Sequence, residues 1–302
     1  MNEIWVDTDF GFDDLWALLV LRHLGKRVAG ITLVAGNAHL DQVVSNALGA
    51  RHAYGFDAPI YVGADRPLVR DSETAESILG ERGMQSRGQY LPDGGTLDEA
   101  LNAHTALQNW LRSAQPNDRR DVLAIGPLTN IARFIQDAPE LAKKITRLIW
   151  MGGSNGAGNH SPLAEYNALA DPEAAAIVAQ SGIAMDAVDL MLCRTVAFGA
   201  DHMPDCDSLT FDLLGGYLDI ALTRGRSNMS IYDPLAALVA SMPDAFEYRT
   251  CDMAVSTIPD MTYGNTTFTE NTNGSTRLVV GTTLDAAQIC LNALSRDNAN
   301  VN

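Results

Sequence analysis

The chain has 302 residues, enough for one large α/β domain or two smaller ones, and its hydrophobic share of 46% and charged share of 19% are ordinary for a globular protein. Its formal net charge of -16 argues against a nucleic-acid partner, because phosphate binding needs basic patches. No window reaches the roughly 18 unbroken apolar residues of a membrane span, so we expect no membrane partner either.

The four cysteines lie far apart and form no CxxC pair, so the sequence indicates neither a zinc site nor a disulfide framework. The sequence opens directly on a strand-like segment, without the basic region and cleavage pattern of a secretory signal. We therefore expect a cytoplasmic protein.

Apolar, β-branched runs alternate with helical patterns along the first two thirds of the chain. Buried strands are predicted over residues 4–6, 28–35, 59–62, 121–125, 145–151 and 184–188. Apolar spacing predicts helices over residues 14–24, 41–54, 97–113, 128–136 and 172–180. The last helix has a defined start, because Asp171 can cap it and Pro172 suits its first position. The alternation predicts an α/β fold, an open and mostly parallel sheet with helices on both faces.

The remaining segments are less regular. Residues 64–96, 152–164 and 223–231 are expected to be loops. Residues 252–282 suggest antiparallel strands around a turn at Asn271–Gly274, and 284–296 suggests a final helix. Because no low-complexity linker or internal repeat interrupts the chain, we favour a single domain over residues 1–302.

Four polar segments each follow a predicted strand. They are residues 7–14, 35–37, 125–130 and 151–159. Ligands of an open parallel sheet bind beyond the carboxyl ends of its strands. We therefore expect these segments to line one rim of the sheet.

The first of them, within "VDTDFGFDD", places Asp7, Asp9, Asp13 and Asp14 close together after an apolar run. Asp13 and Asp14 could simply open a helix, where negative charge meets the positive end of the dipole, and the other two could end the strand. Four carboxylates in one turn repel one another, however, unless a cation neutralises them. Hard divalent ions such as calcium or magnesium prefer such oxygen ligands.

"DTDFGFDD" resembles the DTDPGxDD signature of the nucleoside hydrolases, the inosine-uridine-preferring family. The family's further motifs follow in order as "GN" at 36–37, "IGPLTNIA" at 125–132, "MGG" at 151–153, "GNHSPLAEYNALADPEAA" at 158–175 and "YDPLAAL" at 232–238. The DxD at 7–9 also occurs in haloacid dehalogenase-like phosphatases, but the residue that should follow it and their late acidic motif are not found. The resemblance implies the nucleoside hydrolase fold, one bound Ca2+ and hydrolysis of an N-ribosidic bond to ribose and free base.

The resemblance also implies roles for individual residues. Asp9, Asp14, Asp233 and the backbone carbonyl of Ile125, where the family usually has Thr, would be the calcium ligands. Asp9 would also act as the general base, taking a proton from a water made more acidic by calcium. The residues that would bind the ribose hydroxyls are Asp13, which would accept from the 2'-hydroxyl, and Asn37, Asn159, Glu165 and Asn167.

The chain departs from the family on the side of the leaving base. Tyr232 stands where the family commonly has a His, and Leu79 stands where pyrimidine-preferring relatives often have another. Tyr232 could donate a proton as a catalytic residue, although its usual pKa near 10 makes it a weak acid. It could instead stack on or hydrogen-bond the base, or simply pack. Arg224 and Arg226, in the loop before it, could stabilise an anionic base.

These departures leave three readings open. The first is a calcium-dependent ribonucleoside hydrolase with non-standard leaving-group recognition. The second is a ribose- or nucleoside-binding homologue with little or no turnover, and the third is a hydrolase of another N-riboside, such as a modified nucleoside or nicotinamide riboside. The resemblance further implies a homodimer or homotetramer.

Overall fold

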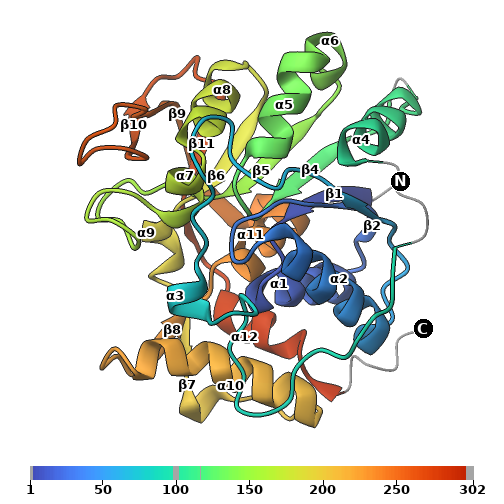
Figure 1. Ribbon diagram of the computed structural model, residues 1–302. Coiled ribbons are helices and arrows are strands. Elements are labelled where there is room, and N and C mark those ends of the chain that lie inside the picture. The colour runs from blue at the N-terminus through green and yellow to red at the C-terminus, as the bar shows by residue number, and fades with distance from the viewer. Residues whose placement is uncertain (1–2, 98–101, 116, 297–302) are drawn as a thin grey trace.

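The computed structural model describes residues 3–97, 102–115 and 117–296. Its main sheet contains β1 (Glu3–Thr8), β2 (Arg27–Leu33), β3 (Ile60–Val62), β4 (Asp121–Ala124), β5 (Arg147–Met151), β6 (Met185–Val188), β9 (Phe246–Val255), β10 (Thr266–Glu270) and β11 (Thr276–Thr282). The strand order is β10-β9-β11-β6-β5-β4-β1-β2-β3. In Figure 1 the β9–β10 end of this sheet lies at the left and β1 and β2 lie at the right.

All six strands predicted from the apolar runs are present, and their pairings with one another are parallel. β1, β4, β5 and β6 are buried along their whole length, which explains why they read as continuous apolar runs. In β1, Ile4 and Val6 enter one apolar cluster, whereas Trp5 enters the other, as expected for side chains that alternate across a sheet.

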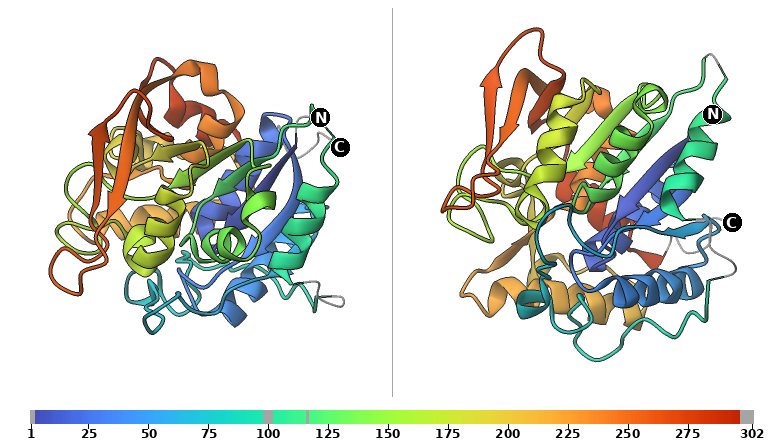
Figure 2. Two further views of the ribbon diagram at one scale, coloured as in Figure 1. Left: turned by 90° about the horizontal axis from the view of Figure 1, so that it is seen from above. Right: turned by 45° about the horizontal axis from the view of Figure 1, so that its top comes forward.

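The helices are α1 (Phe12–His23), α2 (Leu40–Tyr54), α3 (Glu76–Leu79), α4 (Ala103–Arg112), α5 (Thr129–Asp137), α6 (Pro139–Ala142), α7 (Tyr166–Ala170), α8 (Pro172–Gln180), α9 (Leu190–Cys193), α10 (Ser208–Leu222), α11 (Asp233–Ser241) and α12 (Ala286–Asn292). One apolar cluster joins the sheet to α1, α2, α10, α11 and α12, and the other joins it to α4, α5 and α8. Helices therefore cover both faces, as Figure 2 shows, and the predicted open, mostly parallel α/β fold is confirmed.

The five predicted helices correspond to α1, α2, α4, α5 and α8, with ends that differ by a few residues at most places. The prediction for α4 began at residue 97, and residues 98–101 lie outside the described part of the chain. At α8 the predicted start is confirmed, because the Asp171 carboxylate accepts a hydrogen bond from the backbone N–H of Ala174 at 3.0 Å and Pro172 is the first helical residue.

Three predictions about irregular segments were wrong in part. The loop at 64–96 contains α3, and the loop at 223–231 contains β8 (Asn228–Ser230), which pairs with β7 (Ala197–Gly199) in a small second sheet. The turn near Asn271 does not join two paired strands. β10 and β11 both pair antiparallel with β9, which lies between them, so the two strands on either side of this turn do not pair with each other.

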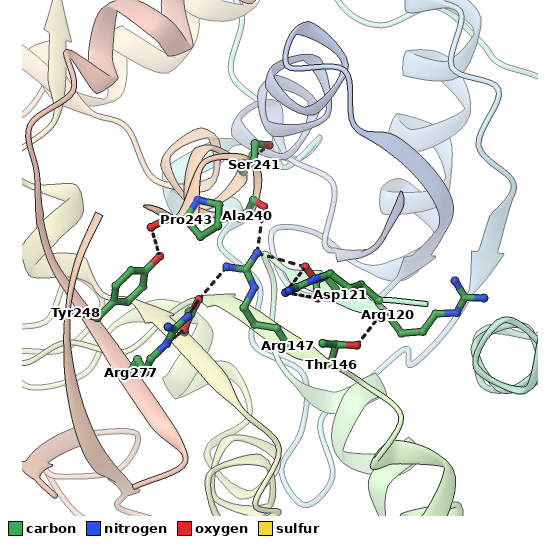
Figure 3. A network of polar contacts seen from close by, with 12 residues as sticks. Arg120, Asp121, Thr146, Arg147, Ala240, Ser241, Pro243, Tyr248 and Arg277 are labelled. Carbon is green, nitrogen blue, oxygen red and sulfur yellow. Dashed lines mark hydrogen bonds and ion pairs between the residues drawn. The ribbon is translucent and has the colours of Figure 1, made fainter. Parts of the chain in front are cut away.

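A buried ion-pair network joins the amino ends of neighbouring strands, opposite the carboxyl ends where the polar segments lie. The Arg147 guanidinium contacts Asp186 at 3.2 Å and Asp121 at 3.4 Å, and donates to the carbonyl of Ala240 at 3.1 Å (Figure 3). Arg277 donates two hydrogen bonds to Asp186 and lies over the ring of Tyr248. The network ties β4, β5, β6 and β11 to α11, which positions the helix that carries Asp233 at its start.

Within the described residues, no helix is both long and apolar enough to cross a membrane.

Candidate active site

The turn between β1 and α1 is held by hydrogen bonds to its own acidic residues. The Asp14 carboxylate accepts from the backbone N–H of Gly11 at 2.7 Å and from the Thr8 hydroxyl, so it caps the first turn of α1. Phe10, between them, has a φ of 41°, a conformation that is uncommon for a residue with a side chain. Asn46 from α2 donates to the carbonyl of Phe10 at 3.1 Å and holds the turn from outside.

Asp9 lies at the carboxyl end of β1 and is 1% exposed. Its carboxylate accepts from the backbone N–H of Asn37 at 2.7 Å and from the Asn37 amide at 3.1 Å, and the same amide reaches Asp14 at 3.2 Å. A Cβ at Gly36 would collide with the Asp9 carboxylate, so this close approach of the "GN" segment requires glycine. The structure therefore places Asn37 against two carboxylates, a contact that the predicted ribose-binding role did not include.

Carboxylates from the β1–α1 turn and from the start of α11, far apart in the sequence, meet beside Asp9. Oxygens of Asp13, Asp14 and Asp233 lie within 4.8 Å of one another. Burial raises the pKa of Asp9 and of Asp233 well above the usual range, and the neighbouring negative charges raise both further. Burial likewise raises the pKa of Asp13 to about 7 and that of Asp14 to about 6. The largest influences on these four groups, after burial, are neighbouring carboxylates and hydrogen bonds.

This donor set fits a divalent metal ion. It offers only oxygen, it is buried, and its carboxylates lie close enough to repel one another. The predicted ligands Asp14 and Asp233 are in the cluster itself. Asp9 is next to it, close enough to hydrogen-bond to Asp14 and influence its pKa. Ile125 lines the same cavity at the end of β4.

Glu165 and the residues around it line the same cavity as Ile125. The Glu165 carboxylate caps α7, because it accepts from the backbone N–H of Gly153 at 2.8 Å, Asn167 at 2.9 Å and Ala168 at 3.1 Å. Burial nevertheless raises the pKa of Glu165 to about 7. The Asn167 amide donates to the carbonyl of Met151 at 2.9 Å, which links α7 to the end of β5.

These groups surround a cavity of about 250 Å³ at the carboxyl ends of the strands. The predicted site residues that line it are Asp9, Asp13, Asn37, Ile125, Asn159, Glu165, Asn167, Tyr232 and Asp233. Asp14 is the exception. It does not line the cavity, but it accepts a hydrogen bond from Asn37, which does. A volume of this order suits a small ligand.

Sequence reasoning missed several residues of the cavity. Tyr217 of α10 donates from its hydroxyl to Asp13 at 3.1 Å and so orients that carboxylate. Met151, Tyr166, Ile220 and Met229 also line the cavity. The apolar pattern of α10 could have marked Tyr217 as buried, but no local signal places its hydroxyl on a residue 204 positions away.

The residues at which the chain departs from the family also line the cavity. Tyr232 is half-buried at the start of α11, and burial raises its pKa above the usual value, which makes its hydroxyl a still weaker acid. Leu79, Arg224, Arg226 and His160 line the same cavity.

Comparisons with known proteins agree with this geometry. The family model described as "Inosine-uridine preferring nucleoside hydrolase" matches residues 4–290. The non-specific ribonucleoside hydrolase RihC of Escherichia coli (strain SMS-3-5 / SECEC) is 34% identical over 272 residues, which cover 87% of this chain and 86% of the relative.

Solved structures match in fold. A plant nucleoside hydrolase superposes with a TM-score of 0.86 at 23% identity, covering 98% of this chain and 99% of the other. A purine-preferring ribonucleoside hydrolase from Gardnerella vaginalis gives 0.85 at 22% identity, with 97% and 99% covered. At these identities the likeness concerns the fold alone.

Proposed function

Because the chain belongs to the inosine-uridine preferring nucleoside hydrolase family, we propose that it hydrolyses the N-glycosidic bond of ribonucleosides to ribose and free base with the help of one Ca2+. The observation that carries this proposal is the group of buried carboxylates, Asp9, Asp13, Asp14 and Asp233, that meet at one cavity and raise one another's pKa. The fold and the N-glycosyl hydrolase class follow from the family. The metal ion and the roles of individual residues are part of the proposal.

Asp14 and Asp233 would hold the cation together with Asp9 and the carbonyl of Ile125. When bound, a divalent cation supplies positive charge that offsets the carboxylates and makes a nearby water more acidic. The donor set is typical of calcium, whose shell of about 6–8 oxygens also leaves room for water and sugar hydroxyls.

Asp9 is the proposed general base. The two hydrogen bonds from Asn37 favour its ionised form, in which it can accept a proton from the attacking water. The water oxygen then bonds to the anomeric carbon while the bond from that carbon to the base nitrogen breaks. Asn37 is thus a positioning residue for Asp9 as well as a candidate ribose contact.

The ribose would lie between Asp13 and the α7 wall. Asp13, oriented by Tyr217, would accept from the 2'-hydroxyl, and Asn159, Glu165 and Asn167 would contact the other hydroxyls. The sugar becomes positively charged as the glycosidic bond breaks, as in other glycoside cleavages, and buried carboxylates favour that charge.

Tyr232 is proposed to contact the leaving base and to donate a proton where the base needs one. Its raised pKa favours a second candidate function, hydrolysis of N-ribosides such as modified nucleosides or nicotinamide riboside, whose bases leave with less protonation. We also propose a single domain over residues 1–302, a homodimer or homotetramer, and a cytoplasmic location. One sheet with strands from Glu3 to Thr282 supports the single domain.

The test is reducing-sugar release from inosine, uridine, other nucleosides and nicotinamide riboside, by protein treated with a chelator and then assayed with and without added calcium. The proposal expects release from at least inosine or uridine that depends on calcium. Ribose release at equal rates without the metal would contradict the role of calcium. Binding of nucleosides without release from any of them would favour the binding homologue.

A further inference from the structure

The cavity has an acidic floor and a basic mouth. Its acidic lining residues are Asp9, Asp13, Glu165 and Asp233, all of them on the side assigned to metal and sugar. Its basic lining residues, apart from His160, are Arg194, Arg224 and Arg226. The mouth is thus positive in a chain with 37 acidic residues and only 21 lysines and arginines.

A fixed turn presents two of these arginines. Arg224 and Arg226 directly follow α10, and the backbone N–H groups of both donate to the carbonyl of Ala221, at 3.0 and 3.1 Å. Gly225, between them, has a φ of 72°, the left-handed conformation that ends many helices. The backbone at the rim is therefore ordered although both side chains are exposed.

Among the residues that the structure describes, both arginines have side chains free to bind a ligand. Within the described residues no ion pair or side-chain hydrogen bond involves Arg224 or Arg226, whereas Arg194 donates to the carbonyls of Ala157 and Gly158. The charge of Arg226 lowers the pKa of Tyr232, against the larger effect of burial, so this guanidinium lies near the phenol proposed to contact the base. A structural alternative is that the two arginines only complement the negative end of the α10 dipole.

We propose that Arg224 and Arg226 make this site select N-ribosides whose base carries a negative charge, such as a carboxylate. This inference rests on the proposed function, because the floor must hold the ribose for the base to reach the mouth. Guanidinium groups suit carboxylates, which they can bind through two parallel hydrogen bonds. In this role the two arginines recognise the base and take no part in breaking the glycosidic bond.

The missing histidine and the arginines fit one chemical class especially well. In a pyridinium N-riboside the electron pair of the broken glycosidic bond returns to the ring nitrogen, and the base leaves without taking up a proton. Water supplies the new oxygen on the anomeric carbon, and its released proton passes to Asp9 and then to solvent. A pyridine-3-carboxylate base therefore needs no strong acid from Tyr232, while its carboxylate can pair with Arg224 or Arg226.

The experiment compares two pyridinium ribosides of nearly equal size, pyridine-3-carboxylic acid riboside and the corresponding carboxamide, with the calcium-loaded wild-type chain. We expect kcat/KM for the carboxylate to exceed that for the carboxamide by about tenfold, as for two partly screened charge pairs. In the double variant Arg224→Gln, Arg226→Gln this ratio should fall to about one. Arg112→Gln, an exposed arginine in the last turn of α4 and away from the cavity, is the matched control and should keep the wild-type ratio.

The outcomes separate this inference from the function on which it rests. If inosine or uridine is cleaved but the carboxylate is not preferred, or if the double variant keeps the wild-type ratio, the inference is overturned and the proposed function stands. If a helix-end role were the whole explanation, the double variant would lower the melting temperature without changing the ratio. If no riboside at all is cleaved, both the proposed function and the inference fail.

Discussion

At the scale of single residues, the account depends most on Asp9, because its carboxylate belongs both to the acidic floor and to the proposed proton transfer. Its pKa is raised by burial and by Asp14, yet two hydrogen bonds from Asn37 hold the charged form. Burying a charged carboxylate costs stability. Asp9 is therefore both a destabilising buried carboxylate and the group proposed to take up the proton.

Replacing Asp9 tests this directly. Asp9→Asn should lower kcat for inosine and uridine by roughly 10²–10⁴-fold, the usual contribution of a general base. The melting temperature in chelator should not fall, since one repelling charge is removed. Asp41→Asn, at an exposed carboxylate of α2, serves as the control and should leave both quantities unchanged. Unaltered turnover in Asp9→Asn would remove Asp9 as the base.

Tyr232 can be tested by varying the leaving group. Tyr232→Phe should lower kcat about tenfold for inosine, whose base leaves poorly, and less than about twofold for p-nitrophenyl riboside, which needs no strong acid. The modest size follows from the raised pKa of the phenol. Steady-state rates on the two substrates measure the difference, and an equal loss on both would exclude proton donation.

At the scale of the elements, the site is built where strands end and helices begin. α1, α7 and α11 each begin with a carboxylate from the site, namely Asp14 in the first turn, Glu165 as the cap and Asp233 as the first residue. The positive end of each helix dipole thus faces the acidic floor and partly offsets its charge. Asp13 and Asp14 can therefore open the helix and also take part in the proposed cation site.

The ion-pair network at the other edge of the sheet should matter for stability and not for chemistry. Asp186→Ala removes the shared partner of Arg147 and Arg277 and leaves Arg147 short of one carboxylate, so we expect a loss of about 3–5 kcal/mol in the free energy of unfolding.

Urea denaturation measures this change. Asp57→Ala, at an exposed carboxylate, is the matched control and should change the free energy of unfolding by less than about 0.5 kcal/mol. A loss of similar size in both variants would show that the network is not what stabilises this edge.

Much of this arrangement could be predicted from the sequence, because it depends on local patterns. The apolar runs predicted every parallel strand up to β6, and the order of polar segments predicted the rim. The position of β9 between β10 and β11 could not be predicted, since no local pattern specifies which strands pair. Tyr217, which orients Asp13, was likewise missed, since no local pattern places its hydroxyl on that carboxylate.

At the scale of the whole molecule, the carboxylates of the proposed metal site come from segments far apart in the sequence, so metal binding and folding should be linked. In the metal-free chain, burial raises the pKa of Asp13 and Glu165 to about 7 and that of Asp14 to about 6. Between about pH 4 and pH 7 the folded state then binds more protons than the unfolded chain. This contribution to stability therefore falls as the pH rises through that window.

Added calcium should offset that loss. We expect the gain in melting temperature on adding calcium, relative to chelator, to grow between about pH 5 and pH 7.5, because protons compete with the cation for the carboxylates. Differential scanning calorimetry at fixed ionic strength measures the gain. A gain that is constant or shrinks with rising pH would contradict the assignment of these carboxylates to the ion.

The most direct measurement is a calorimetric titration of the chelator-treated and dialysed chain with calcium chloride near neutral pH. We predict saturable binding of one ion per chain, and loss of that binding in Asp14→Asn and in Asp233→Asn, which contribute from segments far apart in the sequence. An isotherm without binding, or one that either substitution leaves unchanged, would contradict it.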